Sequence, residues 1–401
     1  MVRFPTILIL LLLVAPGPRA ISQVDTNRIF VRVFGDSLEL PVPGDFNIPY
    51  PGEFSREAIG QFHASLCQSS WKPLLNEMLS YRQEKELNDW LYYQVVRAVA
   101  QQIAPKHENY LRYTLYKWFL MVKSGYDATL NLYHDQLLFY VYSNDEVYNL
   151  PLYVKGGRQY VCLNIHDYAR AAGKVEPEAI LGISLDEPLA TMPFSYKVTR
   201  LPDFDTTGYT ERDISFPYKN RDYQFTLKVN QQVGEVFANY PTVAYEDYFN
   251  IPLSSPTYKS LVPVLRKNLK GKGAREGVDY LMKFTRYAFL YEDDQLHYGK
   301  EKRMSPEQTL LSEASDCDDR AALFFFLVKE LYNLPMLALV YPDHLTIAVH
   351  FDRAYGNTVE YNGRAYSICE PTPQKLNLQV GQIAPKYRNQ AYQVVYAYQP
   401  D

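Results

Sequence analysis

One cysteine of this chain lies among aspartates at the head of a long apolar run, in the stretch SDCDDRAALFFFLVKELYNLP over 315–335. The pattern predicts that Cys317 begins a helix, where unpaired N–H groups and the helix dipole favour a thiolate and could stabilise an oxyanion. Asp316, Asp318 and Asp319 suit the helix start as caps, but carboxylates that face the sulfur would raise its pKa. A cysteine nucleophile here therefore needs a histidine partner.

Two histidines follow on the expected strand HLTIAVHF, and a glutamate follows at the end of the expected strand AYSICEP. We favour His344 as the base because it lies beside Asp343 at the mouth of its strand, where substrate can enter. His350 is a competitor, since its even offset puts it on the same face. Glu370 would orient and stabilise the imidazolium, which completes a candidate triad with Cys317 and His344.

Two other fates are open for the thiol. A cysteine ahead of an apolar helix is most often buried and inert. The four cysteines, Cys67, Cys162, Cys317 and Cys369, could also form up to two disulfides in an oxidising compartment. Adjacent strand residues point to opposite faces, so Cys369 should face away from Glu370, which makes a Cys317–Cys369 disulfide awkward.

The sequence predicts no cofactor and no metal. Glycine-rich phosphate loops, HExxH and paired CxxC motifs do not occur in it. A metal site built from Asp316, Asp318, Asp319 and His344 is a weak alternative, because consecutive carboxylates at a helix start fan outward.

The elements around the triad follow a clear order. After the helix over 317–332 and the breaker NLP come the strands MLALVY, HLTIAVHF, TVEY and AYSICEP, and an Asn-Gly pair signals a hairpin between the last two. This order predicts a helix-borne cysteine packed on an antiparallel sheet that carries the histidine and the glutamate.

These motifs resemble those of the transglutaminase-like superfamily of papain-type cysteine enzymes. Its members have a cysteine at a helix start, a histidine opening a strand, and an acidic residue in an Asp-Pro-Thr-like strand end. The matching stretches here are SDCDDRAALFFFLVKEL, YPDHLTIAVHF and YSICEPTP. The likeness is greatest to secreted or periplasmic bacterial members, which carry a stretch similar to DDQLHYGKEKRMSPEQTLLSEASDCDDR, and it covers roughly 277–396.

The resemblance implies a thioester mechanism on peptide or isopeptide amides. Cys317 would attack the carbonyl, His344 would carry the proton, and Glu370 would orient the ring. The chain has Glu where the family has Asp, which adds one methylene and is tolerated if the strand shifts slightly. It has Asp318 where many members have Trp, and this favours hydrolysis over crosslinking. Gln295 is a candidate second oxyanion donor. The alternative function is a non-catalytic peptide- or glycan-binding protein that keeps the fold.

The whole chain is expected to be α+β, in four segments. These are a signal peptide over 1–20, an N-terminal α+β domain over 24–170, a β-rich middle domain over 175–252 and a transglutaminase-like catalytic domain over 255–401. Alternating stretches predict a strand over 29–40 and middle strands at FSYKVTRL, DYQFTLKV and EVFANYPTV. Helical spacing predicts helices over 87–104, 110–123, 256–268 and 277–291.

Two segments of the chain resemble each other and indicate an internal repeat. Residues 111–164 follow the same order of helix, strands and hairpin as 317–370, with GGRQYVCLN matching NGRAYSICE. In that register Gln136 falls where His344 stands, Asn164 where Glu370 stands, and Leu111 near Cys317. We therefore expect a duplication whose first copy has lost the chemistry, with chance similarity of two α+β units as the alternative.

Composition limits the partners. A net charge of -4 and a pI near 6.0 leave no basic field for nucleic acid. The early Arg, apolar run and small-residue end of 1–20 are typical of a secretory leader, so we expect a secreted or periplasmic protein that does not span a membrane. Its expected partner is a peptide or protein substrate, with a cell-wall or glycan polymer as a further option.

Overall fold

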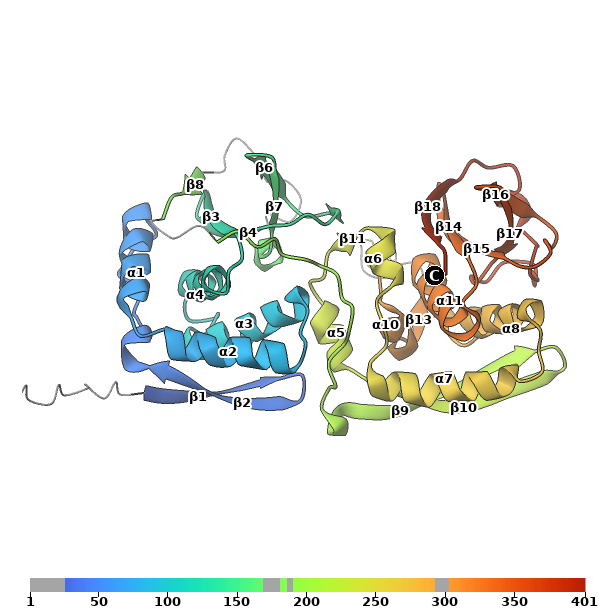
Figure 1. Ribbon diagram of the computed structural model, residues 1–401, viewed down its shortest axis with the longest axis horizontal. Helices are drawn as coiled ribbons and strands as arrows, with labels where there is room; N and C mark the ends of the chain where they lie inside the picture. The colour runs from blue at the N-terminus through green and yellow to red at the C-terminus, as the bar shows by residue number, and fades with distance from the viewer. Residues whose placement is uncertain (1–25, 169–180, 186–189, 293–302, 401) are drawn as a thin grey trace, which may run out of the picture.

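The computed structural model describes residues 26–168, 181–185, 190–292 and 303–400, and it shows two α+β units side by side (Figure 1). In each unit a five-stranded antiparallel sheet lies on one side of a helical layer, and a two-stranded hairpin lies on the other side. The expected signal peptide over 1–20 and Gln295 lie outside the described residues. Within the described part of the chain, no helix is long and apolar enough to cross a membrane.

The first unit begins with a hairpin and four helices and ends with its sheet. The hairpin pairs β1 (Thr26–Val33) with β2 (Asp36–Pro43), and the helices are α1 (Arg56–Gln68), α2 (Lys72–Glu84), α3 (Asp89–Ile103) and α4 (Tyr110–Lys123). Side chains of Ser55, Asn88 and Asn109 cap α1, α3 and α4. The sheet runs in the order β6-β7-β4-β3-β8 and consists of β3 (Ala128–Tyr133), β4 (Gln136–Tyr142), β6 (Leu152–Lys155), β7 (Arg158–Cys162) and β8 (Leu181–Ile183).

The second unit repeats this plan. Its hairpin is β9 (Tyr209–Tyr218) with β10 (Arg221–Asn230), and its main helices are α7 (Ser255–Leu269), α8 (Ala274–Tyr287), α10 (Pro306–Leu311) and α11 (Cys317–Tyr332). Its sheet runs β16-β17-β15-β14-β18, with β14 (Met336–Tyr341), β15 (His344–His350), β16 (Thr358–Tyr361), β17 (Arg364–Cys369) and β18 (Gln393–Tyr398). The described residues also contain short helices and strands: β5 (Val147–Tyr148), α5 (Gln232–Phe237), β11 (Thr242–Val243), α6 (Tyr245–Phe249), β12 (Leu290–Tyr291) and β13 (Ala314–Ser315).

The two sheets share strand order and register. The first hairpin pairs Tyr133 with Gln136, and the second pairs Tyr341 with His344. Each sheet has one face in the main hydrophobic core and the other in a small separate cluster. The repeat expected from the sequence is therefore present as a repeated topology.

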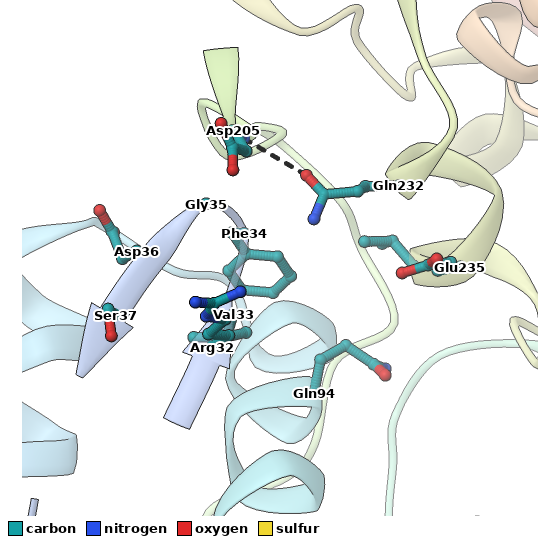
Figure 2. A pocket seen from close by; sticks show the side chains of 11 residues that line it. Arg32, Val33, Phe34, Gly35, Asp36, Ser37, Gln94, Asp205, Gln232 and Glu235 are labelled. Carbon is teal, nitrogen blue, oxygen red and sulfur yellow. Dashed lines mark hydrogen bonds between the residues drawn. The ribbon is translucent and has the colours of Figure 1, made fainter. Parts of the chain in front are cut away.

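The strand expected over 29–40 is wrong. The stretch over 29–40 is a hairpin and not one strand, because the chain turns at Phe34 and Gly35. Gly35 has φ +93°, and a Cβ there would lie 2.3 Å from the Asp205 backbone nitrogen, so a side chain would strain the turn and clash. Figure 2 shows this turn beside Asp205, whose N–H donates to Gln232. A polar cavity of about 540 Å³ lies next to it.

The segment over 175–252, expected to be β-rich, contains both strands and short helices in its described part, and its strand β8 belongs to the sheet of the first unit. Of its three expected strands DYQFTLKV forms one in full, in β10, and the β9–β10 hairpin packs on α7 and α8 of the second unit. The stretch FSYKVTRL buries alternate residues, as a strand would, but the N–H groups of Ser195 and Tyr196 donate to the carboxylates of Asp89 and Asp145. EVFANYPTV begins inside α5, and its last two residues form β11, which pairs with β5.

Candidate functional site

The N-terminus of α11 is built by a local capping box. The Asp316 side chain accepts hydrogen bonds from the N–H groups of Asp318 at 3.0 Å and Asp319 at 3.2 Å, and Asp319 accepts one from the Asp316 N–H at 3.3 Å. Cys317 is the first residue of the helix. Among the described residues none accepts a hydrogen bond from its N–H. This amide is thus available to an oxyanion that forms next to the sulfur.

Asp318 is the aspartate that faces the thiol. Its Oδ1 lies 3.5 Å from the Cys317 sulfur, which donates to it, and its Oδ2 accepts a hydrogen bond from Arg303 Nε at 3.1 Å. The Arg303 guanidinium lies 4.0 Å from the Tyr245 ring centroid, so a cation–π contact holds it in place. The charge next to the thiol is therefore balanced by an arginine from outside the helix.

The surroundings of Cys317 favour the neutral form of its thiol. Burial raises its pKa well above its usual range, and the carboxylates of Asp318 and Asp316 raise it further. A hydrogen bond from the Leu345 N–H to the sulfur acts in the opposite direction and is the weaker effect. The thiol consequently needs a base if it is to act as a nucleophile.

His344 and Glu370 form a buried pair. His344 Nε2 lies 2.7 Å from Glu370 Oε2, and both side chains are less than 5% exposed. Glu370 Oε1 accepts the Thr372 N–H at 2.9 Å, and the imidazole stacks on the Tyr387 ring with centroids 4.8 Å apart. Burial lowers the pKa of His344, but Glu370 outweighs this and the net pKa is raised. Because Nε2 is paired with Glu370, Nδ1 is the ring nitrogen that could accept a proton from a thiol.

The Cys317 thiol contacts the start of β15, the strand that His344 begins, but it makes no hydrogen bond to the His344 ring. Within the described part of the chain, no hydrogen bond joins the Cys317 sulfur to His344, although the sulfur accepts one from the neighbouring Leu345 N–H. Leu345 belongs to the core under α11, whereas the His344 ring stacks on Tyr387 of the separate cluster on the other face of the sheet. The structure thus unites two of the three expected residues and places the third nearby, turned to Asp318.

His350 lies at the opposite end of β15 from His344. Its Nδ1 is 2.9 Å from the Ala365 carbonyl oxygen, and its ring lies beside Tyr366. A strand of seven residues separates the two histidines by about 20 Å. Of the two, only His344 is close to the helix start and the glutamate.

Sequence reasoning missed three side chains around the pair. Arg286 is buried and donates to the main-chain oxygens of Glu370 and Leu378, which holds the strand end in place. Tyr387 covers the imidazole, and Arg303 faces Asp318. Arg303 lies in the stretch quoted for the family resemblance, but nothing in the spacing of Arg286 or Tyr387 signals a role.

The other expectations on ligands and cysteines can be placed in the structure. All four cysteines are free thiols; Cys67 is exposed, and Cys162 and Cys369 are buried. In the described residues no group of three or more His, Cys, Asp and Glu could hold a metal ion. Asp319 is turned away from Asp318 to accept the Met304 N–H at 2.7 Å, so the aspartates do not converge.

The matching position of the first unit is a hydrogen-bonded network around Asn164, to whose Oδ1 the buried Cys162 thiol donates at 3.5 Å. The helix α4 begins at Tyr110, so this residue, and not Leu111, stands where Cys317 stands. Asn164 stands where Glu370 stands; its Oδ1 accepts the Phe139 N–H at 2.8 Å, and its Nδ2 donates to the Leu137 carbonyl and the Tyr110 hydroxyl. In the first unit the residue that corresponds to Glu370 is Asn164, and its side chain joins the strand β4 to the helix α4.

Replacing Asn164 with alanine is expected to lower the free energy of unfolding by about 2–4 kcal/mol, because it removes four hydrogen bonds and leaves buried backbone groups unpaired. Urea denaturation followed by circular dichroism measures the change. Asn76→Ala, at an exposed position of α2, is the matched control and should cost less than about 0.5 kcal/mol. Equal losses in the two variants would contradict the structural role of Asn164.

No protein-family model, curated protein or solved structure matches this chain. What can be stated of its class comes from its own geometry. It is a mixed α+β protein with two curled antiparallel sheets of the same strand order. The second sheet carries a buried histidine–glutamate pair beside a helix that starts with a cysteine.

Proposed function

We propose that this protein is a secreted or periplasmic cysteine enzyme of transglutaminase-like fold, which cleaves peptide or isopeptide amides through a thioester on Cys317. The observation that carries the proposal is the buried contact of 2.7 Å between His344 and Glu370 beside the first turn of α11. A carboxylate that holds an imidazole next to a helix-borne cysteine is the arrangement that nucleophilic thiol catalysis requires. Hydrolysis is favoured over crosslinking.

The reaction takes place in two steps and consumes one water. As the Cys317 sulfur bonds to the amide carbon, its proton moves to His344 Nδ1, and the Cys317 N–H donates to the developing oxyanion. The carbon–nitrogen bond then breaks, and the proton passes from the imidazolium to the leaving amine. Water attacks the thioester, gives its proton to His344, and the carbon–sulfur bond breaks; the thiol regains the proton and the acid is released.

The thiol must turn from Asp318 to the imidazole before it reacts. A side chain of this length exchanges between staggered rotamers without movement of the helix backbone. Arg303 supports the turn, since its ion pair with Asp318 reduces the cost of losing the thiol hydrogen bond. The raised pKa of His344 helps the first step, because it stabilises the imidazolium that protonates the leaving amine.

The test is turnover of glutaminyl peptides with and without a primary amine, in a Cys67→Ser background that removes the exposed thiol. Release of the acid alone indicates hydrolysis, and incorporation of the amine indicates transfer. Cys317→Ala should abolish either activity and also prevent formation of an acyl-enzyme with p-nitrophenyl acetate. Absence of turnover on an amide library, together with absence of Cys317 alkylation by iodoacetamide at neutral pH, would contradict the enzyme.

A second candidate function is non-catalytic binding of a peptide or glycan by the same fold. It is favoured by the burial and the aspartates that raise the pKa of the Cys317 thiol. The rate of iodoacetamide alkylation as a function of pH separates the two, because only the thiolate reacts. A thiol that titrates below about 7 fits a nucleophile, whereas one that titrates above about 9 and forms no acyl-enzyme fits the binding protein.

A further inference from the structure

A cavity of about 740 Å³ opens where the two units meet. Its lining comes from the loop around β5 in the first unit, and from β11, α6, Arg303 and the start of β18. Figure 1 places β11 and α6 between the units. The volume lies in the range of pockets that enclose small molecules or a few residues of a peptide.

Arg303 connects this cavity to the candidate active site. Arg303 lines the cavity and its guanidinium stacks on Tyr245, while its Nε donates to Asp318 at 3.1 Å. The other carboxylate oxygen of Asp318 accepts the hydrogen bond from the Cys317 thiol. A group bound in the cavity is thus separated from the reactive sulfur by only two side chains.

The ionisable lining of the cavity is negative. Among the residues that the structure describes, its cations are Lys197 and Arg303, and both have partners: Lys197 Nζ lies 3.2 Å from Asp247, and Arg303 is paired with Asp318. The lining holds four carboxylates against these two cations, namely Asp145, Glu146, Glu246 and Asp247. In the described part of the chain neither Glu146 nor Glu246, both exposed, has an ion-pair partner. The excess charge is therefore free to attract a cation.

Aromatic rings add a second feature that suits a cation. Tyr148, Tyr245 and Tyr396 line the same cavity, and the faces of aromatic rings attract ammonium groups. Asp247 is mostly buried, and burial raises its pKa while Lys197 only partly offsets this. A further positive charge nearby would stabilise the ionised carboxyl. Cavity, rings and charge all favour the same kind of ligand.

We propose that this cavity binds a primary amine of the substrate, so that the preferred peptides carry a lysine-type side chain close to the amide that Cys317 attacks. The catalytic half of this statement rests on the proposed function, whereas the binding half does not. An ammonium group in the cavity would meet the carboxylates of Glu146 and Glu246 and the tyrosine rings. The rest of the peptide would extend past Arg303 to the thiol.

Isothermal titration calorimetry on the full chain with Cys317→Ala tests the binding half. The probe is acetyl-Lys-Lys-Lys-amide, and the control is the same peptide with each side-chain amine acetylated. We expect the free amines to bind at least about tenfold more tightly at low salt, and the difference to shrink as ionic strength rises from about 0.05 to 0.5 M. Equal affinities for the two peptides would overturn the proposal.

A matched pair of double variants locates the site. Glu146→Gln with Glu246→Gln should weaken binding of the trilysine peptide by about tenfold. Glu57→Gln with Glu77→Gln makes the same change of charge at exposed positions of α1 and α2 and should leave the affinity unchanged. If both pairs weaken binding equally, the peptide recognises only the net charge of the protein, and the proposal is wrong.

The outcome can be separated from that of the proposed function. If the protein binds free amines selectively but Cys317 never forms an acyl-enzyme, the proposed amine site is supported and the proposed enzymatic function is wrong. Peptide amides with lysine or acetyl-lysine beside the scissile bond could instead be turned over at equal kcat/KM and bound equally well. That result would support the enzymatic function and show that the proposed amine site is wrong.

Discussion

Replacing Glu370 with glutamine is expected to slow acylation of Cys317 by p-nitrophenyl acetate by on the order of 10³-fold. The amide keeps the size of the side chain and its contact with the Thr372 N–H, but it cannot stabilise the imidazolium that forms as the sulfur loses its proton. Stopped-flow measurement of the p-nitrophenolate burst in the Cys67→Ser background gives the rate. Variation of the rate with pH should show the base titrating at lower pH in the variant.

The sign of the pH effect on stability follows from the same pair. The pKa of folded His344 is raised above its ordinary value of 6.5, so the pair contributes stability that is fully present below pH 6.5 and is lost as pH rises through the folded pKa. Glu370→Gln should therefore cost about 1–3 kcal/mol more near pH 6 than near pH 9 in urea denaturation.

A buried glutamate elsewhere in the second unit controls for the substitution itself. Glu307 accepts hydrogen bonds from Ser254 and Thr257 and is as buried as Glu370, but it does not contact the triad residues. Glu307→Gln should leave the acylation rate within about threefold of the parent. A rate for Glu370→Gln equal to that of this control would exclude the orienting role.

Asp318→Asn is expected to speed alkylation of Cys317 by iodoacetamide at pH 7 by about ten- to a hundredfold. The carboxylate lies 3.5 Å from the sulfur and raises the pKa of the thiol, so its removal should lower that pKa by about one to two units. Arg303→Met should act in the opposite direction, because it leaves the Asp318 charge without its ion-pair partner. Rates measured from pH 6 to 10 in the Cys67→Ser background give both pKa values.

Asp352→Asn, at an exposed position beyond β15, is the matched control and should leave alkylation unchanged. If Asp318→Asn behaves as this control does, burial alone sets the pKa of the thiol and the aspartate has no electrostatic effect on it. In that case the contact between Asp318 and Arg303 would also not connect the thiol electrostatically to the cavity between the units.

Much of the second unit could be predicted from the sequence, because short-range interactions decide it. The helix start at Cys317 follows from a capping box within four residues, and the hairpin pairing of β16 with β17 follows from the Asn-Gly turn. Once β15 pairs with β17, Glu370 comes to the end of the strand next to that of His344. The pairing of these two residues therefore follows from turn chemistry and the two-residue period of strands.

The failures came where a side chain took the place of a backbone partner. FSYKVTRL alternates as a strand does, yet two of its N–H groups donate to the carboxylates of Asp89 and Asp145, which lie far away in the sequence. The stretch over 29–40 also alternates, but the turn at Gly35 folds it into a hairpin whose strands pair with each other. The periodicity of a sequence indicates which residues are buried. It does not indicate which groups form hydrogen bonds with their backbone.

The sequence by itself determined where each candidate residue stands: Cys317 at a helix start, His344 at a strand start and Glu370 at a strand end. Only the tertiary structure decided what each one contacts. The thiol is turned to Asp318 and the imidazole is covered by Tyr387, while Arg303 joins the site to a cavity between the units. Caps and turns act over a few residues and can be read from spacing, whereas these contacts join segments that only the packing of the whole chain brings together.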